Sequence, residues 1–201
     1  MSLDAMDAST LRIGGFVPFS AIDYPGYLAA VVFCQGCPWR CRYCHNVHLQ
    51  PPRGPDEISW SRIVGLLARR RGLLDAVVFS GGEPTLQAAL PAAMRAVKAM
   101  GYRIGLHTAG IYPKRLADVL PLVDWIGMDV KAALADYERV TATPSSASRA
   151  LRSIDLVRAS GIRCQFRTTV DPQVLTPDRL EALSSDLVRL GVRDHVLQPC
   201  R

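Results

Sequence analysis

The chain has 201 residues, of which 49% are hydrophobic and 21% are charged, and its formal net charge at pH 7 is +6. This length and composition are those of one ordinary globular domain with enough residues for a core. No apolar run approaches the ~20 residues of a membrane span. The one dense basic cluster, residues 69–71, is typical of a solvated helix end, so nucleic-acid binding is not favoured. The positive charge equally suits an acidic protein partner.

Residues 1–10 are polar, carry two acidic residues and lack the apolar stretch of a signal peptide. We therefore expect a flexible leader at 1–10 and one domain over residues 11–201. The absence of a secretory signal favours the reducing cytoplasm, where clustered cysteines indicate metal or redox chemistry rather than disulfides.

Apolar runs alternate with helical patterns along the rest of the chain. Two β-branched runs, at 11–19 and 28–34, flank the turn sequence Asp23-Tyr24-Pro25-Gly26. The second run is apolar throughout, as in a parallel strand covered on both faces. Six strands are counted, at residues 28–33, 76–79, 102–106, 125–129, 162–170 and 196–198. Five helices are predicted between them, at residues 57–72, 86–100, 114–122, 146–160 and 177–190, the last with Thr176 as its N-cap.

Alternation of strands and helices of this length predicts right-handed crossovers and a parallel sheet. Six such units are too few for the closed eight-stranded barrel, which typically takes ~250 residues. We therefore predict an α/β fold, a partial (β/α)6 TIM-like barrel in a single domain. Its working residues are expected at the C-terminal ends of the strands.

Four of the six cysteines follow the first counted strand, with Cys34 and Cys37 at spacing C-x2-C and Cys37, Cys41 and Cys44 at C-x3-C-x2-C. Thiolates are soft ligands that suit iron–sulfur clusters, zinc and Cu(I). A structural zinc site usually pairs two C-x2-C knuckles across a longer spacer, and this chain has no second knuckle. Three thiolates on a four-iron cluster would leave one iron free for a small molecule. We favour an iron–sulfur cluster on Cys37, Cys41 and Cys44.

The cysteine motif is followed by His45-Asn46 and, some forty residues later, by Phe79-Ser80-Gly81-Gly82-Glu83-Pro84. Together these segments resemble the radical S-adenosylmethionine (radical SAM) superfamily. Within it, Gly14-Gly15-Phe16, Asp23-Tyr24-Pro25-Gly26 and Cys34-Gln35-Gly36-Cys37 resemble the glycyl-radical-enzyme activases, most of all the activating protein of anaerobic ribonucleoside-triphosphate reductase.

The resemblance implies one 4Fe–4S cluster and S-adenosylmethionine as cofactors, since residues 45–80 contain no cysteine for a second cluster. It implies reductive cleavage of S-adenosylmethionine, after which a 5′-deoxyadenosyl radical abstracts hydrogen from a backbone glycine of a partner enzyme. The implied partners are a glycyl radical enzyme and an electron donor such as flavodoxin or ferredoxin.

The resemblance also implies cofactor contacts at the strand ends. Gly81 and Gly82 would receive the methionine amine, and Tyr43 would lie near the adenine. Asp129 and Lys131, which point to one side of an extended segment, would contact ribose and carboxylate groups. The remaining candidates are His45, Asn46, Glu83, His107 and Arg167.

Each of these assignments has a plainer alternative. Gly81 and Gly82 could form an ordinary strand-to-helix turn, which Glu83 could brace. Tyr43 could simply pack against the loop, and Asp129 and Lys131 could be a solvated pair.

The chain departs from pyruvate formate-lyase activases in two places. They carry Asp-Thr-Asn-Gly where this chain has His107-Thr108-Ala109-Gly110, which argues against a cation site of their kind. They also carry a histidine near the final strand, where this chain has Gln198-Pro199-Cys200-Arg201.

Four residues outside the motif are assigned plain structural roles. Cys34 and Cys164 are predicted to pack in the core as small apolar residues. His48 and His195 are predicted to be ordinary surface or loop histidines. No role is assigned to Cys200.

Two alternative functions stay open. The first is a radical SAM enzyme that acts on a small molecule, such as a 7-carboxy-7-deazaguanine synthase. The second is a non-catalytic zinc-binding module.

Overall fold

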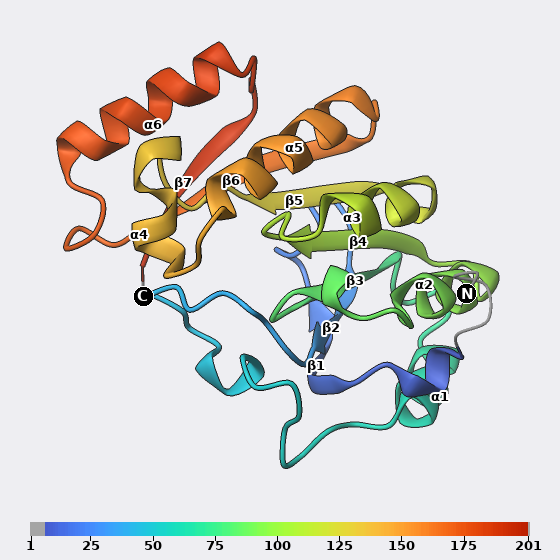
Figure 1. Ribbon diagram of the computed structural model, residues 1–201. Helices are drawn as coiled ribbons and strands as arrows, with labels where there is room; N and C mark the ends of the chain where they lie inside the picture. The colour runs from blue at the N-terminus through green and yellow to red at the C-terminus, as the bar shows by residue number, and fades with distance from the viewer. Residues whose placement is uncertain (1–6, 201) are drawn as a thin grey trace.

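Seven strands form one sheet in sequence order in the computed structural model, which describes residues 7–200 (Figure 1). They are β1 (Ile13–Ser20), β2 (Ala29–Cys34), β3 (Ala76–Gly81), β4 (Arg103–Thr108), β5 (Trp125–Asp129), β6 (Arg163–Val170) and β7 (His195–Pro199). Strands β2 to β7 pair in parallel, which confirms the six counted strands. The run at 11–19, left out of that count, supplies β1, which is antiparallel to β2. The barrel stays open because β1 and β7 are the two edges of the sheet.

Five helices connect the parallel strands: α1 (Trp60–Ala68), α2 (Leu90–Ala99), α3 (Pro113–Val119), α5 (Ser146–Ala159) and α6 (Pro177–Arg189). All five lie within the predicted ranges, except that α3 begins one residue earlier than predicted, at Pro113. A short additional helix, α4 (Tyr137–Thr141), was not predicted. No helix in the described part of the chain is both long enough and apolar enough to cross a bilayer.

Local chemistry sets several of these helix boundaries. Helix α1 begins three residues later than predicted because the Ser59 side chain accepts a hydrogen bond from the backbone N–H of Arg62. Helix α2 begins later because residues Pro84–Leu86 form a separate 3-10 turn, with Glu83 as its cap. Thr176 takes the N-cap position of α6, although its side chain makes no capping hydrogen bond.

The predicted leader falls only partly within the described residues. Residues 1–6 lie outside them. Ala8–Thr10 form a 3-10 turn whose cap, Asp7, accepts a hydrogen bond from Ser9 N at 2.9 Å.

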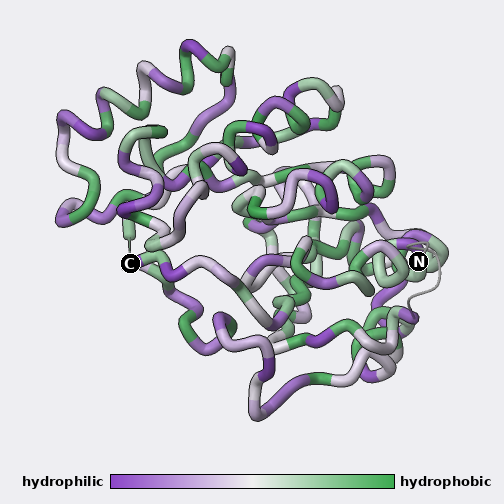
Figure 2. Tube along the Cα trace, in the orientation of Figure 1, coloured by the Kyte–Doolittle hydropathy of each residue, from purple (hydrophilic) through white to green (hydrophobic). Residues whose placement is uncertain are grey.

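Side chains alternate between the two faces of the sheet, as the two-residue period of a strand requires. In β2, Ala30 and Val32 belong to the large core between the sheet and the helices. Ala29 and Val31 belong to a smaller cluster on the other, inner face of the sheet. Hydrophobic positions run along the central strands, whereas hydrophilic and hydrophobic turns alternate along α6 (Figure 2). The helices therefore cover the outer face, and the inner face is free to carry a site at one end.

Candidate functional site

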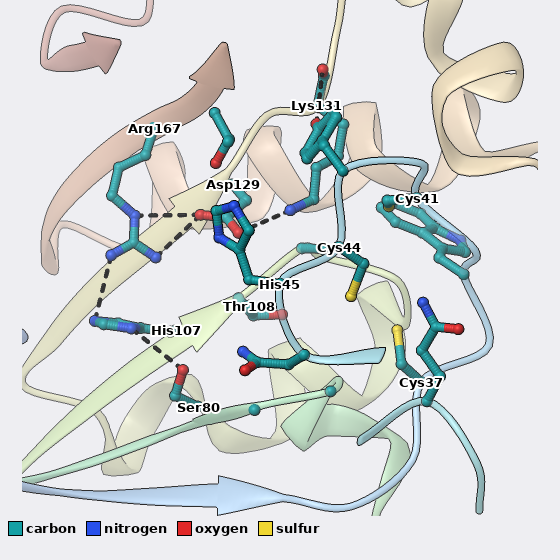
Figure 3. Close-up of a pocket in the computed structure, with 18 residues that line it drawn as sticks. Cys37, Cys41, Cys44, His45, Ser80, His107, Thr108, Asp129, Lys131 and Arg167 are labelled. Atoms are coloured by element: carbon teal, nitrogen blue, oxygen red, sulfur yellow. Dashed lines mark hydrogen bonds and ion pairs between the residues drawn. The ribbon is translucent and has the colours of Figure 1, made fainter. Parts of the chain in front are cut away.

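A cavity of ≈180 Å³ opens at the C-terminal ends of the parallel strands (Figure 3). Its wall combines the loop after β2 with the ends of β3, β4, β5 and β6. All of the predicted site residues except Glu83 line it, namely Cys37, Cys41, Tyr43, Cys44, His45, Asn46, Gly81, Gly82, His107, Asp129, Lys131 and Arg167. Segments up to 130 residues apart in the chain thus meet around one space.

The cysteine loop is fixed to the rest of the structure at both ends. The backbone N–H of Cys37 donates to the carbonyl of Gln50 at 3.1 Å, and that of Arg40 donates to Thr141 at 3.0 Å. The buried Gln35 amide donates to the carbonyls of His48 and Pro51, at 3.1 and 2.8 Å. These contacts hold the loop across the end of the barrel.

The loop thiols are free, and burial changes their acidity. Burial raises the pKa of Cys37 to about 12 and also raises the pKa of Cys41. The nearby Lys131 ammonium opposes the shift at both residues because it favours the thiolate. Binding of iron would therefore release protons from these thiols, with Lys131 offsetting part of the thiolate charge.

The donors of this wall fit an iron–sulfur cluster. Cys37, Cys41 and Cys44 supply three thiols, the ligand type that such clusters use. Within residues 7–200, no three His, Cys, Asp or Glu side chains are grouped closely enough to hold a single metal ion. Trp39 lines the same cavity, and its buried Nε1 has no hydrogen-bond partner in the described part of the chain. A sulfur atom of a bound cluster would give this N–H an acceptor.

Gly81 and Gly82 lie where two backbone segments cross too closely for a side chain. A Cβ atom on Gly81 would lie 2.4 Å from the backbone nitrogen of Cys34, and Gly81 has φ = +115°. A Cβ atom on Gly82 would lie 2.3 Å from the carbonyl oxygen of Gly36. Both glycines line the cavity. Their lack of a side chain is needed for packing in the first place, because it lets the end of β3 pass against the cysteine loop.

Glu83 lies behind the cavity wall and not on it. Its side chain is fully buried, and Oε1 accepts hydrogen bonds from the hydroxyls of Thr85 (2.6 Å) and Thr108 (2.7 Å). Oε2 accepts from the backbone N–H of Ala109 at 3.0 Å. The carboxylate thereby joins the turn after β3 to the end of β4. These are the contacts of a brace, and a ligand contact by Glu83 stays a prediction.

Asp129 carries two cationic partners, one on each carboxylate oxygen (Figure 3). Oδ2 accepts from Lys131 Nζ at 2.9 Å, and Oδ1 accepts from Arg167 at 3.0 Å. Asp129 and Arg167 are direct partners in the β5–β6 register, which places their side chains opposite each other. Burial alone would raise the pKa of Asp129, but Lys131 and Arg167 hold it below its usual range. The predicted same-side placement of Asp129 and Lys131 is confirmed, and the pair is embedded in a wider network.

His107 is a neutral side chain beside this network. Its Nε2 lies 2.8 Å from the carbonyl oxygen of Asp23, so Nε2 carries the proton and donates. Nδ1 is then free to accept from the Ser80 hydroxyl at 3.4 Å. Burial and the Arg167 guanidinium lower the pKa of His107 to about 4. At neutral pH the imidazole therefore adds no charge to the wall.

Tyr43 and His45 tie the cysteine loop to later strands. The Tyr43 hydroxyl donates to the carbonyl of Lys131 at 3.2 Å, and its ring packs with apolar residues at the base of α4 and α6. His45 Nε2 lies 3.3 Å from the thiol of Cys200, just after β7. Tyr43 therefore both packs against the loop and lines the cavity.

Six residues on the wall were not among the predicted site residues: Trp39, Gln50, Ser80, Thr108, Ala109 and Thr169. Ser80, Thr108 and Ala109 belong to strand-end segments that the sequence did single out, but no role was assigned to them. Thr169 follows Arg167 by two positions on β6, so strand alternation could have found it. Trp39 lies inside the C-x3-C spacing, which was a usable signal. Gln50 carried none, because only the folded loop brings it to Cys37.

The other cysteines and histidines lie away from the wall. Cys34 is fully buried in the main core and Cys164 is partly buried against it, as predicted. His48 is exposed, as predicted. His195 instead begins β7, where its Nε2 lies 2.9 Å from the Thr168 hydroxyl, because the parallel pairing brings those strands together.

Comparison with known proteins identifies the family. The radical SAM superfamily model matches residues 31–184. A proposed glycyl-radical enzyme activating enzyme of Methanocaldococcus jannaschii is 32% identical over 182 residues, which are 86% of this chain and 73% of the relative. The pyruvate formate-lyase-activating enzyme of Clostridium pasteurianum is 32% identical over 60% of this chain, and the match spans about half, 52%, of that protein. The 7-carboxy-7-deazaguanine synthase of Thermococcus kodakarensis is 28% identical over 72% of this chain and 62% of the relative.

Solved structures share the fold at low sequence identity. SuiB of Streptococcus suis bound to its precursor peptide SuiA has a TM-score of 0.66 at 11% identity and covers 85% of this chain and 38% of that one. Native anSMEcpe with bound AdoMet has a TM-score of 0.62 at 15% identity and covers 83% of this chain and 49% of that one.

Radical SAM proteins use a 4Fe–4S cluster and S-adenosylmethionine, and the cavity wall has the donors for both. The matched segment begins in β2, before the cysteine loop, and ends in α6, so it includes nearly the whole wall. The chain therefore belongs to the radical SAM superfamily.

Proposed function

We propose that this chain is an activase that generates a glycyl radical on a partner enzyme, and that the partner is an anaerobic ribonucleoside-triphosphate reductase. The observation that carries the proposal is the single cavity on which the three loop thiols, Gly81–Gly82 and the Asp129 network converge. The similarity to the Methanocaldococcus jannaschii relative supports the activase class. The motifs around Gly14–Phe16 and Cys34–Cys37 support the choice of reductase.

Cys37, Cys41 and Cys44 would hold the cluster, and the remaining wall would hold S-adenosylmethionine. Lys131 and Arg167 line the cavity and would supply the positive charge for the carboxylate of the methionine moiety. Asp129 stays ionised and has acceptor capacity for ribose hydroxyls. When bound, the cluster and S-adenosylmethionine together supply one-electron reductive cleavage and the 5′-deoxyadenosyl radical that removes hydrogen from the partner's glycine.

The residues of the barrel would orient the bound molecule and keep water away from it. His107 stays neutral, so it does not compete with Lys131 and Arg167 for the carboxylate. The sheet does not close between β1 and β7, and a glycine-bearing loop of the partner would approach the cavity from this open side. We place the reaction in the cytoplasm, with flavodoxin or ferredoxin as the electron donor.

The test is anaerobic EPR on protein reconstituted with iron and sulfide, then reduced and mixed with S-adenosylmethionine and a candidate reductase. The proposal predicts a reduced-cluster signal that shifts on cofactor binding and gives way to a glycyl doublet on the reductase. Formation of 5′-deoxyadenosine with no glycyl radical on the reductase, or on pyruvate formate-lyase, would reject the activase assignment and leave the cofactor chemistry intact.

A second candidate is a radical SAM enzyme of deazapurine synthesis. The sequence similarity to the Thermococcus kodakarensis 7-carboxy-7-deazaguanine synthase favours it. Formation of 7-carboxy-7-deazaguanine, measured by mass spectrometry without any partner protein, would establish this candidate against the activase.

A further inference from the structure

A second cavity, of ≈440 Å³, lies on the outside of the barrel between the start of α3 and the face of α5. Helices α3 and α5 pack side by side there (Figure 1). The charged residues that line it are Lys114, Arg115, Arg149 and Arg152, and none of its lining residues is acidic. Tyr112 completes the lining with an aromatic ring. We call this cavity the basic cleft.

The positive charge of the basic cleft is not neutralised by the protein. Within residues 7–200, no acidic side chain forms an ion pair with any of its four cationic residues. The acid nearest to Arg152 on α5, Asp155, is directed to Arg158 at 4.0 Å. Asp118 on α3 lines a separate, neighbouring pocket together with Arg115. The basic cleft therefore presents unpaired positive charge to solvent.

Part of the basic cleft is preorganised. Arg115 donates to the carbonyls of Thr85 and Leu86, and its guanidinium lies 5.0 Å from the centre of the Tyr112 ring. Tyrosine and arginine are the residue types enriched where proteins bind each other. Lys114 and Arg152 are exposed, which suits contact with a protein surface better than enclosure of a small ligand.

The basic cleft adjoins the cysteine loop. Arg115 is bound to the carbonyl of Leu86, and the Leu86 side chain packs so closely on Gly36 that a Cβ atom there would lie 2.8 Å from Leu86 Cδ2. Gly36 directly precedes Cys37. A protein seated in the basic cleft would thus be separated from Cys37 by the packed pair Leu86 and Gly36.

We propose that the basic cleft is the docking surface for an acidic electron-carrier protein that delivers the single electron the site requires. The proposal rests on the proposed function, because only a redox site needs such a carrier. The carrier loses one electron from its own flavin or iron–sulfur group, and the cluster on the cysteine loop gains it. Complementary charge steers such encounters and raises their rate, and salt weakens them by screening.

The test uses stopped-flow reduction of the cluster-loaded protein by flavodoxin hydroquinone under anaerobic conditions. The variant is Arg149→Glu/Arg152→Glu, which reverses two charges of the basic cleft. The matched control is Arg69→Glu/Arg71→Glu, which makes the same change in net charge at the end of α1, outside the basic cleft. Dithionite, a small reductant that needs no docking, checks that each variant carries a reducible cluster.

We expect the basic-cleft variant to lose at least tenfold in the second-order rate constant at low salt. The loss should shrink to about twofold or less at high salt, while the control variant and all dithionite rates stay near those of the unmodified protein. Equal losses in both variants would assign the effect to net charge and overturn the proposal. So would an unchanged rate in the basic-cleft variant, or no reduction of the unmodified protein by either flavodoxin or ferredoxin.

A further outcome separates this proposal from the proposed function. If flavodoxin reduction depends on the basic cleft but no glycyl radical forms on a reductase, the docking surface stands and the activase assignment fails. If the basic-cleft variant is reduced normally but loses glycyl-radical formation, the basic cleft serves the other partner and this proposal fails.

Discussion

The inner face of the sheet has two halves that differ in chemistry. Towards the N-terminal ends of the strands, Val31 and Val78 belong to a buried apolar cluster, which we call the apolar half. Towards the C-terminal ends, the same face carries His107, Asp129 and Arg167, which we call the polar half. In β5 both kinds of residue occur on one strand, with Trp125 in the apolar cluster and Asp129, four residues later, in the polar half. The apolar half is held by burial, whereas the polar half is held by hydrogen bonds and ion pairs between neighbouring strands.

The difference between the two halves shows which part of such a fold can carry a functional site. Burial in the apolar half stabilises the sheet without any directional contact. The polar half depends on register, because Asp129 meets Arg167 only when β5 and β6 pair as they do. Changes in the apolar half should therefore alter stability, and changes in the polar half should alter binding.

The largest effect is expected at the cysteines, because some line the cavity and others pack in or against the core. Cys41→Ser should remove one cluster ligand from the cavity wall and reduce bound iron and the cluster's visible absorbance to near background, since oxygen is a poor substitute for a soft thiolate. Cys164→Ser, which alters a partly buried thiol packed against the main core, is the matched control and should retain the cluster. Equal iron contents in the two variants would contradict the assignment.

The apolar half can be tested alone with Val31→Ala. Val31 is fully buried, so loss of its two methyl groups should lower the free energy of unfolding by about 2–3 kcal/mol. Chemical denaturation measures this loss. The affinity for S-adenosylmethionine should change by about twofold or less, because the variant retains the register of β5 and β6. A large loss of affinity with little loss of stability would show that the two halves are not separate.

His107 makes the polar half sensitive to pH. The pKa of His107 is about 4 in the folded protein, whereas in the unfolded chain it takes the ordinary histidine value of 6.5. Between pH 4 and pH 6.5 the unfolded chain therefore binds more protons than the folded protein. Stability is therefore complete above pH 6.5 and declines as the pH falls through this window, by about 2 kcal/mol at pH 5. His107→Gln should flatten this part of the pH dependence in denaturation experiments. An unchanged slope in the variant would place the titration elsewhere.

Much of the fold could be predicted from the sequence, because apolar runs such as residues 28–33 and 76–79 are long enough to indicate buried strands. Helix α4 could not, because five residues carry too little periodicity. The position of the cavity wall could also be predicted, because functional residues in barrels of this kind lie at the C-terminal ends of the strands. The place of Glu83 did not follow, because its partners Thr108 and Ala109 come from another strand. The close approach of Gly81 and Gly82 to the cysteine loop could not be predicted either, because it depends on contact between two segments that are far apart in the sequence.

The smallest expected effect concerns Trp39, whose Nε1 has no hydrogen-bond partner among residues 7–200. A hydrogen bond from this N–H to a cluster sulfur would stabilise the reduced, more negative state by ~0.5–1.5 kcal/mol. Trp39→Phe should therefore lower the reduction potential by ~20–60 mV in an anaerobic redox titration. Trp60→Phe, which changes a tryptophan in α1, should leave the potential unchanged. A shift of equal size in both variants would contradict the role of the indole.

The most direct test of the division between the two halves is equilibrium binding of S-adenosylmethionine to the cluster-loaded protein, compared between the unmodified chain and Asp129→Asn. Asparagine keeps the shape of the side chain but removes the charge that holds Lys131 and Arg167 in place. The account predicts that affinity falls at least tenfold while the cluster content is unchanged. An affinity equal to that of the unmodified protein would contradict the claim that the polar half is the cofactor site.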